Sequence, residues 1–544
     1  MNRCRNLAIF LLLLTGLQAA FASAYDAKPK LVVVIVIDQF RGDYLERYHN
    51  EFGPGGFRLL MEHGAYFPDC AYNYATLVTG PGHASIGTGS YTIGHGILAN
   101  DWFDPQLGKR VTSVSDESTR IVGVEPGGVG SSPHNLLTDT FGDELRMATQ
   151  GKSRVFGISL KDRAAILPTG HSANAAYWID TKTGAWITSD YYVKSLPVWV
   201  DSMNHSDAAK KYLGREWKDA VGKVMGNTNP RNDEDGKPES YYELVGSTPF
   251  ANDLELDFAR SLITNEKLGS GTTTDLLVIS LSENDILGHA VGPDAPQLHA
   301  SILQLDRQLA GFFQFLDKQF GMSNVWLALT ADHGVAPVPR VAQALHIPAP
   351  EVDPKEWAAK INDEIAKQTG KPGKYVLGFN LPILSLNVST FADTKEADAE
   401  RVAGEALLKT GALAYFTKAD LATGKVAGTP MGQKFANSYS PYGPWYVLAL
   451  PRPFTIPKEE GTTHFSPYSY DTHVPLAFYG APFQPGVYRE HSEPIDLAVT
   501  ISSLLGITKP AAATGRVLTE TLKPQPKSLN PSSAEGHARN GVVK

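Results

Sequence analysis

LVVVIVID, residues 31–38, is a run of seven apolar, mostly β-branched residues that ends in an aspartate. Such a run is typical of a strand that is buried on both faces of a parallel sheet. Three further runs have the same character: residues 155–159, 275–281 and 325–329. Helical patterns lie between them, including residues 135–148 and 296–320. The alternation predicts an α/β fold with a doubly wound, mostly parallel sheet and helices on both faces.

Two long segments interrupt the alternation. Residues 171–252 are rich in Trp, Tyr, Asn and Asp, and we interpret them as an insertion over the edge of the sheet. Residues 337–458 contain a helical pattern at 355–367, an alternating strand at 382–388 and a charged helix at 395–410. This second segment is predicted to be an inserted α+β subdomain. The predicted organisation is a signal peptide at 1–24, a first part of the core at 25–336, the inserted subdomain at 337–458, a second part of the core at 459–522 and a disordered tail at 523–544.

The N-terminus has the features of an export signal. Arg3 and Arg5 precede an almost wholly apolar stretch at 7–20, and Ala22-Ser23-Ala24 offers a small-x-small cleavage pattern. The apolar stretch is short for a bilayer span, and no later stretch is long and apolar enough to form one. We therefore expect a periplasmic or secreted protein without a stable membrane span.

Composition and charge exclude several classes of partner. After cleavage Cys70 is the only cysteine, so an intrachain disulfide cannot form. The net charge is −8 for the full chain and becomes −10 when Arg3 and Arg5 are lost. A general binder of nucleic acid or of membrane surfaces usually carries basic patches instead. We expect a monomer whose partners are small molecules, with no nucleic acid as a structural partner.

Carboxylates and histidines follow the predicted strands. Ligands bind at the carboxyl ends of strands in open parallel sheets, so the residues that follow each run are candidates for a site. A mixture of His and Asp ligands suits Zn²⁺, whereas Mg²⁺ or Ca²⁺ sites favour oxygen alone. Two three-ligand zinc sites need six ligands, and the strand ends offer five: Asp38, Asp285, His289, Asp332 and His333. Each residue alone could be a turn former or a helix cap.

The sixth ligand is expected to be a histidine near the last core strand, which is predicted at 474–479. His464 and His473 both lie in the preceding stretch, GTTHFSPYSYDTHVPLAFY at 461–479. His473 directly precedes the strand and could cap it, and His464 lies in the loop before it. The spacing leaves both open.

The candidate nucleophile lies in NYATLVTGPGHASIGTG, residues 73–89. Thr79 is followed by Gly80-Pro81-Gly82, and Pro81 suits the first turn of a helix. A hydroxyl at a helix N-terminus lies where backbone N–H groups and the helix dipole favour a phosphoryl group. The alternative is a threonine that only caps the helix. Metal coordination is one of the few ways to ionise a threonine hydroxyl near neutral pH, so a nearby metal site favours the nucleophile.

These stretches together resemble the alkaline phosphatase superfamily, and within it the phosphate-irrepressible alkaline phosphatases of the PafA type. Seven blocks carry the resemblance in family order between residues 31 and 479: VIVIDQFRGDYL, NYATLVTGPGHASIGTG, ILANDWFD, GISLKDRAAI, SENDILGHAVGPDA, TADHGV and THFSPYSYDTHVPL. The same core occurs in type I phosphodiesterases and nucleotide pyrophosphatases.

The resemblance implies two zinc ions. One would be bound by Asp285, His289 and a late histidine, and the other by Asp38, Asp332 and His333, with Thr79 as its reactive ligand. In related proteins the late ligand opens an H-x-S-P-Y stretch, which here begins at His464. Phe465 departs from the glycine that relatives usually have at that position.

The resemblance also implies a substrate. Asn100, Lys161 and Arg163 match phosphate-contacting residues, and an amide, an ammonium and a guanidinium suit the dianion of a phosphate monoester. The implied activity is that of an alkaline phosphatase that forms a phosphothreonine at Thr79 and releases inorganic phosphate. The alternatives are a phosphodiesterase or nucleotide pyrophosphatase on the same core and a non-catalytic, metal-dependent phosphate binder.

Overall fold

The computed structural model describes residues 28–523 except 207–208, 234–235, 392–393, 427 and 459–460. The predicted signal peptide and all but the first residue of the predicted tail lie outside the described residues. Within the described part of the chain, no helix has the length and apolar character needed to cross a bilayer.

The strand formed by the opening stretch is the centre of the main sheet. β1 (Leu31–Ile37) lies between β12 (Asp275–Leu281) and β13 (Val325–Thr330) and is parallel to both. β7 (Val155–Ser159) pairs parallel with β12, and β8 (Ala175–Ile179) pairs parallel with β7. All seven residues of β1 are fully buried, as expected for a strand covered on both faces. The predicted α/β fold with a mostly parallel sheet is confirmed.

Antiparallel strands extend this parallel centre on both sides. The last core strand, β20 (Leu476–Tyr479), is antiparallel to β13 and also pairs with β2 (Ala65–Phe67). Beyond β8, the sheet continues antiparallel through β9 (Trp186–Ser189) and β5 (Ser115–Val122). Two short strands, β21 (Gly486–Val487) and β6 (Val129–Ser131), form the two edges. The full order of the 11-stranded sheet is β21-β2-β20-β13-β1-β12-β7-β8-β9-β5-β6.

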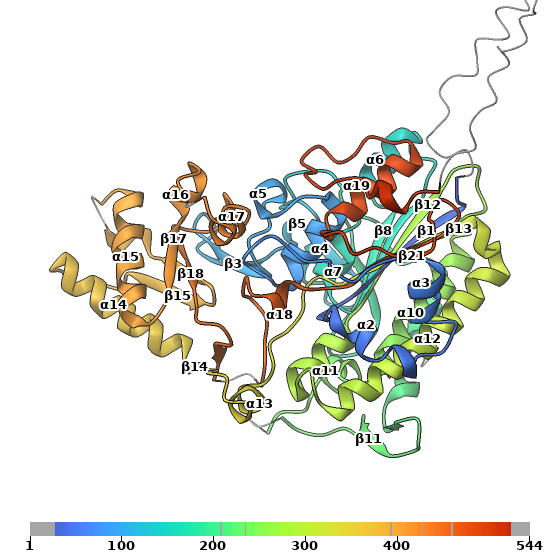
Figure 1. Cartoon of the computed structure of the whole chain (residues 1–544), viewed down its shortest axis with the longest axis horizontal. Helices are drawn as coiled ribbons and strands as arrows, with labels where there is room; N and C mark the ends of the chain where they lie inside the picture. Colours follow the sequence, from blue (N-terminus) through green and yellow to red (C-terminus); the bar gives the residue numbers. More distant parts are fainter. Residues whose placement is uncertain are drawn as a thin grey trace, which may run out of the picture.

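Helices cover both faces of the sheet (Figure 1). One layer contains α10 (Phe250–Asn265), α11 (Glu283–Val291) and α12 (Pro296–Phe320). The other layer contains α4 (Thr79–Thr88), α6 (Phe141–Ala148), α7 (Asp162–Ile166) and α19 (Asp496–Leu505). The predicted bounds of α12 agree with the structure.

The predicted helix at 135–148 begins later, at Phe141. Thr140 caps this helix, because its hydroxyl accepts a hydrogen bond from Asp143 N at 3.2 Å and its own N–H donates to the Asp143 carboxylate at 2.8 Å. This reciprocal pair of bonds satisfies the free N–H groups of the first turn and determines where the helix starts.

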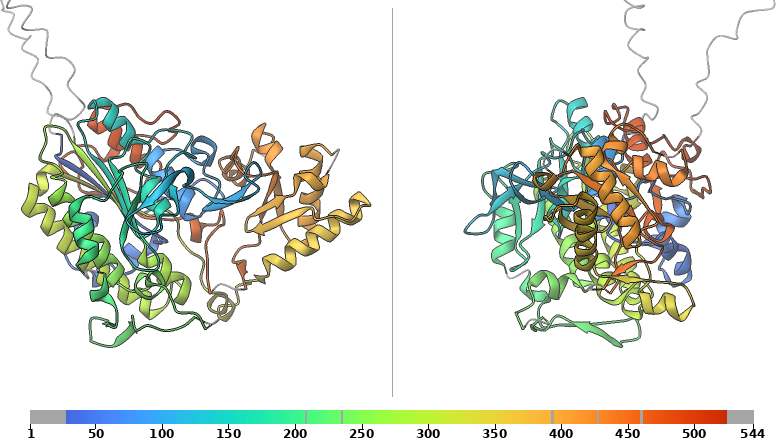
Figure 2. Two further views of the ribbon diagram at one scale, coloured as in Figure 1. Left: turned by 180° about the vertical axis from the view of Figure 1, so that it is seen from behind. Right: turned by 90° about the vertical axis from the view of Figure 1, so that its left-hand side faces the viewer.

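Residues that follow β13 form a lobe beside the main sheet (Figures 1 and 2). Its four-stranded antiparallel sheet has the order β15-β16-β18-β17 and is accompanied by α14 (Pro354–Thr369) and α15 (Glu396–Thr410). The strands are β15 (Val376–Asn380), β16 (Ile383–Leu386), β17 (Ala414–Thr417) and β18 (Tyr446–Leu450). The lobe has a hydrophobic core of its own, which includes Ile361, Leu384 and Leu407.

The predicted insertion at 171–252 is wrong in its first part. β8 and β9 lie within this range, yet Phe156 of β7 pairs directly with Ala175 of β8. These two strands are therefore part of the central sheet. The sequence alone did not indicate this, because the pairing partners of a strand depend on packing across the whole sheet.

Candidate active site

The carboxyl ends of the three central strands meet at one edge of the sheet. In the register of β1, Val36 pairs with Ser280 of β12 and with Thr330 of β13. Asp38 follows β1 directly, and its N–H donates to the carbonyl of Leu281 at 3.0 Å. Residues that follow these three strands therefore lie together at the edge where open α/β sheets bind ligands.

The first group of candidate metal ligands is formed by Asp38, Asp332 and His333. Their donor atoms lie within 4.8 Å of one another, and all three side chains are buried. His333 Nε2 is 3.3 Å from Asp38 Oδ1 and 3.3 Å from Asp332 Oδ2. None of these three atoms makes a well-aligned hydrogen bond to a described residue. Converging buried ligand atoms that lack well-aligned hydrogen bonds fit a metal ion, and a mixture of carboxylate and imidazole suits zinc.

The second group is formed by Asp285, His289 and His464. Asp285 Oδ1 is 3.1 Å from His289 Nε2 and 3.4 Å from His464 Nε2. The other ring nitrogens are held by backbone carbonyls, since His289 Nδ1 contacts Thr462 O and His464 Nδ1 contacts Leu77 O, each at 2.8 Å. A carbonyl bonded to Nδ1 selects the tautomer in which Nε2 is free to bind a metal ion, and this is the usual setting of metal-binding histidines.

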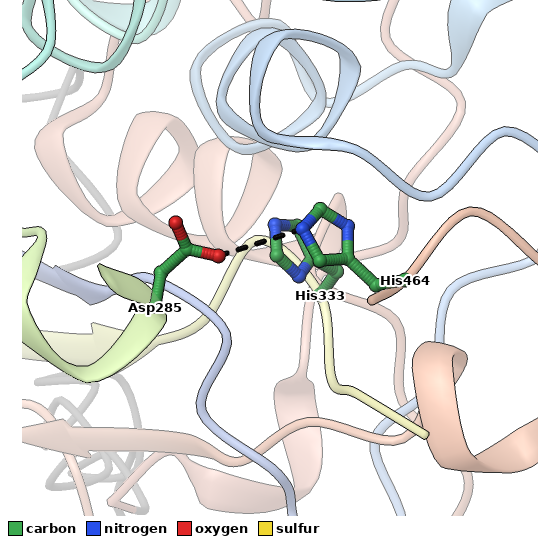
Figure 3. Close-up of side chains that lie close together, drawn as sticks. All are labelled: Asp285, His333 and His464. Atoms are coloured by element: carbon green, nitrogen blue, oxygen red, sulfur yellow. Dashed lines mark ion pairs between the residues drawn. The ribbon is translucent and has the colours of Figure 1, made fainter. Parts of the chain in front are cut away.

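The two groups adjoin one another (Figure 3). The rings of His333 and His464 stack with their centroids 3.4 Å apart. The donor atoms of Asp285, His333 and His464 also lie within 4.8 Å of one another. The sheet edge thus holds one continuous cluster of carboxylates and imidazoles that could bind two metal ions side by side.

His473, the alternative late histidine, does not face this cluster. Its Nε2 contacts the carbonyl of Pro68 at 2.7 Å. Its ring covers Gly42 so closely that a Cβ at this glycine would lie 2.7 Å from the ring atoms. The structure brings His464, and not His473, to the other predicted ligands.

The electrostatics of the cluster favour a divalent cation. Burial raises the pKa of Asp38, and the carboxylate of Asp285 raises it further. Burial also raises the pKa of Asp285, but the ammonium of Lys161, together with His289 and His464, outweighs this effect and holds the pKa well below its usual range. Burial and the neighbouring His333 lower the pKa of His464 to about 3, so this imidazole is neutral. A cation would reduce the repulsion between the carboxylates. It could also bind His464 without displacing a proton, because this imidazole is already neutral.

Thr79 is the first residue of α4 and is 2% exposed. The capping position is taken by Val78, so the threonine does not have the capping role that was the alternative interpretation. Gly80 N–H donates to Asn100 Oδ1 at 2.7 Å. This bond orients the Asn100 side chain so that its NH₂ group can donate elsewhere, beside the N-terminus of the helix.

α4 packs against the loop that follows β13. His83 Nδ1 is 2.9 Å from Thr79 O and 3.2 Å from Asp332 Oδ2, so it connects the first turn of the helix to the first ligand group. A Cβ at Gly82 would lie 2.4 Å from Asp332 O. His83 was not singled out from the sequence as a site residue. Its spacing of four residues from Thr79, which puts both on one face of a helix, is the signal that could have identified it.

Substituting Gly82 with alanine is expected to move the candidate nucleophile, Thr79, away from the first group of candidate ligands. The added methyl group cannot fit against Asp332 O, so α4 must shift, which should lower the free energy of unfolding by about 1–3 kcal/mol. A displacement of about 1 Å should lower kcat roughly 100-fold. Urea unfolding and steady-state kinetics measure the two effects.

Gly428→Ala is the control, because a Cβ there meets nothing within 4 Å. A Gly82→Ala variant with unchanged stability and kcat would contradict this close packing.

Lys161 and Arg163 differ in their placement. Lys161 Nζ lies 2.6 Å from Asp38 Oδ2 and 2.5 Å from Asp285 Oδ2, so the buried ammonium joins the two ligand groups. This contact with both carboxylates was not predicted. Arg163 makes no hydrogen bond or ion pair with either group among the described residues, and its guanidinium is 4.0 Å from the Asp162 carboxylate.

A cavity of about 390 Å³ opens from the cluster toward the lobe. Asn100, His289 and His464 line it on the core side, and Phe379 lines it on the lobe side. Phe465 also lines the cavity and packs into the hydrophobic core of the lobe. The residue that departs from the family pattern thus connects the loop of His464 to the lobe.

Two further residues hold the ligand loops and were not singled out from the sequence. Asp471 Oδ2 accepts hydrogen bonds from Ser466 N at 2.8 Å and Ser466 Oγ at 2.6 Å, which orders the loop that begins at His464. Burial raises the pKa of Asp471 to about 6. Asn284 Nδ2 donates to Asp38 O at 3.0 Å and joins the ends of β1 and β12.

Comparison with known proteins gives matches over most of the chain. Residues 32–405 match the family described as type I phosphodiesterase / nucleotide pyrophosphatase. The chain is 35% identical to alkaline phosphatase PhoV of Synechococcus elongatus, over 91% of this chain and 94% of that protein. It is 34% identical to alkaline phosphatase PafA of Elizabethkingia meningoseptica, over 94% of this chain and 98% of that protein. The crystal structure of wild-type alkaline phosphatase PafA superimposes with a TM-score of 0.82 at 32% identity and covers 91% of this chain and 99% of that chain.

Proposed function

The chain belongs to the type I phosphodiesterase / nucleotide pyrophosphatase family, and from this membership and the site geometry we propose that it is an exported alkaline phosphatase. The proposed reaction is the hydrolysis of phosphate monoesters through a phosphothreonine at Thr79. The observation that carries the proposal is the pair of adjoining carboxylate and imidazole groups beside the N-terminus of α4.

Two zinc ions are the proposed cofactors. Asp38, Asp332 and His333 would hold one, with Thr79 as an additional ligand, and Asp285, His289 and His464 would hold the other. The support is the set of buried donor atoms without hydrogen bonds in the first group and the Nε2 atoms that face Asp285 in the second. When bound, zinc lowers the pKa of a coordinated hydroxyl and offsets negative charge on the oxygens around phosphorus.

The residues of the chain account for the remaining steps. Thr79 Oγ1 loses its proton to solvent and attacks phosphorus, an O–P bond forms, the bond from phosphorus to the leaving alkoxide breaks, and the alkoxide takes up a proton from water. Water then attacks the phosphothreonine, which restores the threonine hydroxyl and releases inorganic phosphate. The transition states of phosphoryl transfer are loose, so the main contributions of the protein are positioning and charge.

Three side chains are proposed to contact the phosphoryl oxygens. The NH₂ group of Asn100 can donate because its Oδ1 is already occupied by Gly80 N–H. The buried ammonium of Lys161 adds a fixed positive charge between the two ligand groups. Arg163 would supply a planar pair of donors. A monoester carries one more negative charge than a diester, so these cations favour the monoester.

The expected kinetic signature is a preference for p-nitrophenyl phosphate over bis-p-nitrophenyl phosphate in kcat/KM. Arg163→Ala is expected to lower kcat/KM for the monoester by about 100-fold or more, and the double variant with Lys161→Ala should lower it further. Each substitution removes a positive charge that would stabilise the bound dianion. The diester should lose much less. Steady-state kinetics on both substrates measures the ratio.

Lys194→Ala is the matched control, because this lysine side chain is 84% exposed and its ion pair among the described residues is with Asp190. It should leave both rates unchanged. Faster turnover of the diester by the parent enzyme would favour the phosphodiesterase alternative and overturn the assignment.

Export and a monomeric state complete the proposal. Export is supported by the basic, apolar and small-residue pattern of residues 3–24. Sequencing of the N-terminus of the protein recovered from the periplasm or medium tests the cleavage after residue 24, and sedimentation tests the monomer.

A further inference from the structure

Gln39, which directly follows Asp38, has an unusual backbone conformation. Its φ is +62°, in the left-handed region that disfavours residues with a Cβ. The side chain is fully buried. A strained residue persists only where its surroundings hold it in place, so the contacts of Gln39 indicate what its conformation achieves.

Those contacts reach both ligand groups. The backbone N–H of Gln39 donates to Asp332 Oδ1 at 3.1 Å, and its side-chain Nε2 donates to Asp285 Oδ1 at 2.8 Å. Asn284 Nδ2 donates to the carbonyl of Gln39 at 3.0 Å. Asp332 belongs to the first group and Asp285 to the second, so one residue bonds to a carboxylate of each.

The other atom of the amide is confined by helix α11. A Cβ at Gly288, the residue before His289, would lie 2.1 Å from Gln39 Oε1. The amide is therefore packed against a position that has room only for glycine. Rotation by half a turn would direct Oε1 at the Asp285 carboxylate, where two acceptors repel each other. The donor orientation toward Asp285 is thus the one that the site permits.

We infer that Gln39 is a positioning residue that sets the relative placement of the two metal subsites, and that Gly288 is glycine to make room for its amide. The inference rests on the proposed two-metal function. Gln39 would act through the ligands, since its N–H groups orient Asp332 and Asp285 and it would not itself contact the substrate. Hydrogen bonds of this kind to metal ligands typically change metal affinity by about 10–100-fold.

The experiment compares the parent with Gln39→Gly, Gly288→Ala and the double variant. Zinc affinity is measured by competition with a chelator, zinc content is measured per chain, and the Tm is measured after metal removal. Gln39→Gly is expected to weaken zinc binding about 10–100-fold while the Tm of the metal-free protein stays the same or rises, because glycine tolerates the positive φ.

Gly288→Ala is expected to weaken zinc binding to a similar extent, because the methyl group displaces the Gln39 amide. In the Gln39→Gly background the clash partner is gone, so Gly288→Ala should add less than about a twofold effect. A purely structural role for either residue would instead give two independent losses that multiply.

Gln150→Gly is the matched control, because Gln150 also has a positive φ, of 54°, but lies exposed at the end of α6. It should leave zinc affinity unchanged.

Gln39→Asn keeps a residue that tolerates positive φ but has a shorter amide side chain. This variant should therefore fold and lose zinc affinity even if the glycine variant does not fold. Parent-like zinc affinity in Gln39→Asn and Gln39→Gly, or multiplicative losses in the double variant, would overturn the inference. A parent protein that neither binds zinc nor hydrolyses p-nitrophenyl phosphate would instead refute the proposed function.

Discussion

Replacing Thr79 with alanine is expected to lower kcat for p-nitrophenyl phosphate by at least about 10⁴-fold, because the proposed covalent intermediate forms on the hydroxyl that is removed. The six proposed metal ligands remain in this variant, so zinc content should stay at the parent level. Thr79→Ser keeps a hydroxyl and should retain measurable turnover. Steady-state kinetics, zinc content and trapping of the phosphorylated protein at low pH measure these outcomes.

Thr88→Ala is the matched control for the nucleophile. Thr88 lies on the same helix, is fully buried and donates its hydroxyl to Ala84 O at 2.8 Å. Its loss should cost about 1 kcal/mol of unfolding free energy with little change in kcat. Parent-like activity in Thr79→Ala, or a phosphoryl group trapped on another residue, would mean that the nucleophile lies elsewhere. Loss of zinc together with activity would identify Thr79 as a structural ligand.

Removal of metal by a zinc chelator is expected to lower kcat/KM by at least about 10³-fold and to lower the Tm by several degrees. Asp38, Asp285 and Asp332 are buried within one cluster, and Lys161 is the cation that the structure shows in contact with two of them. Without metal, these carboxylates repel one another. A ligand that binds only the folded chain at about 1,000 times its Kd contributes about 4 kcal/mol to stability.

Adding Zn²⁺ back should restore both activity and Tm, while Mg²⁺ should not, because three of the six proposed ligands are imidazoles. Asp332→Asn tests the site without a chelator, and it should lower the zinc content by about one ion per chain. Full activity after exhaustive chelation would exclude a metal-dependent mechanism. Restoration by Mg²⁺ alone would contradict the choice of zinc.

The strand runs and their terminal carboxylates could be predicted because both are local features. A strand such as LVVVIVI has apolar side chains on both of its faces, so both faces must be covered. Two parallel strands have their carboxyl ends at the same edge of the sheet. The convergence of Asp38, Asp285 and Asp332 follows from those two facts. The bounds of α12 were predictable for a similar reason, since its periodic pattern is long and Pro296 marks its start.

Predictions failed where a boundary or a pairing depended on other parts of the chain. The helix at 135–148 begins only at Phe141, because the bonds between Thr140 and Asp143 define its first turn. β8 and β9 were assigned to an insertion. Their pairing with β7 and β5 could not be foreseen, because it is a property of the assembled sheet. The spacing could not choose between His464 and His473, since both precede the same strand.

The sequence by itself therefore determined the class of fold, the edge at which the ligands gather and the chemical types of those ligands. The resemblance already favoured His464 as the late ligand, but only the tertiary structure showed that His464 faces Asp285, how α4 packs against Asp332, and that Gln39 joins the two ligand groups. The physical reason is range. Burial patterns and strand ends are encoded in neighbouring residues, whereas a loop histidine or a strained glutamine acquires its role from contacts between segments that are hundreds of residues apart.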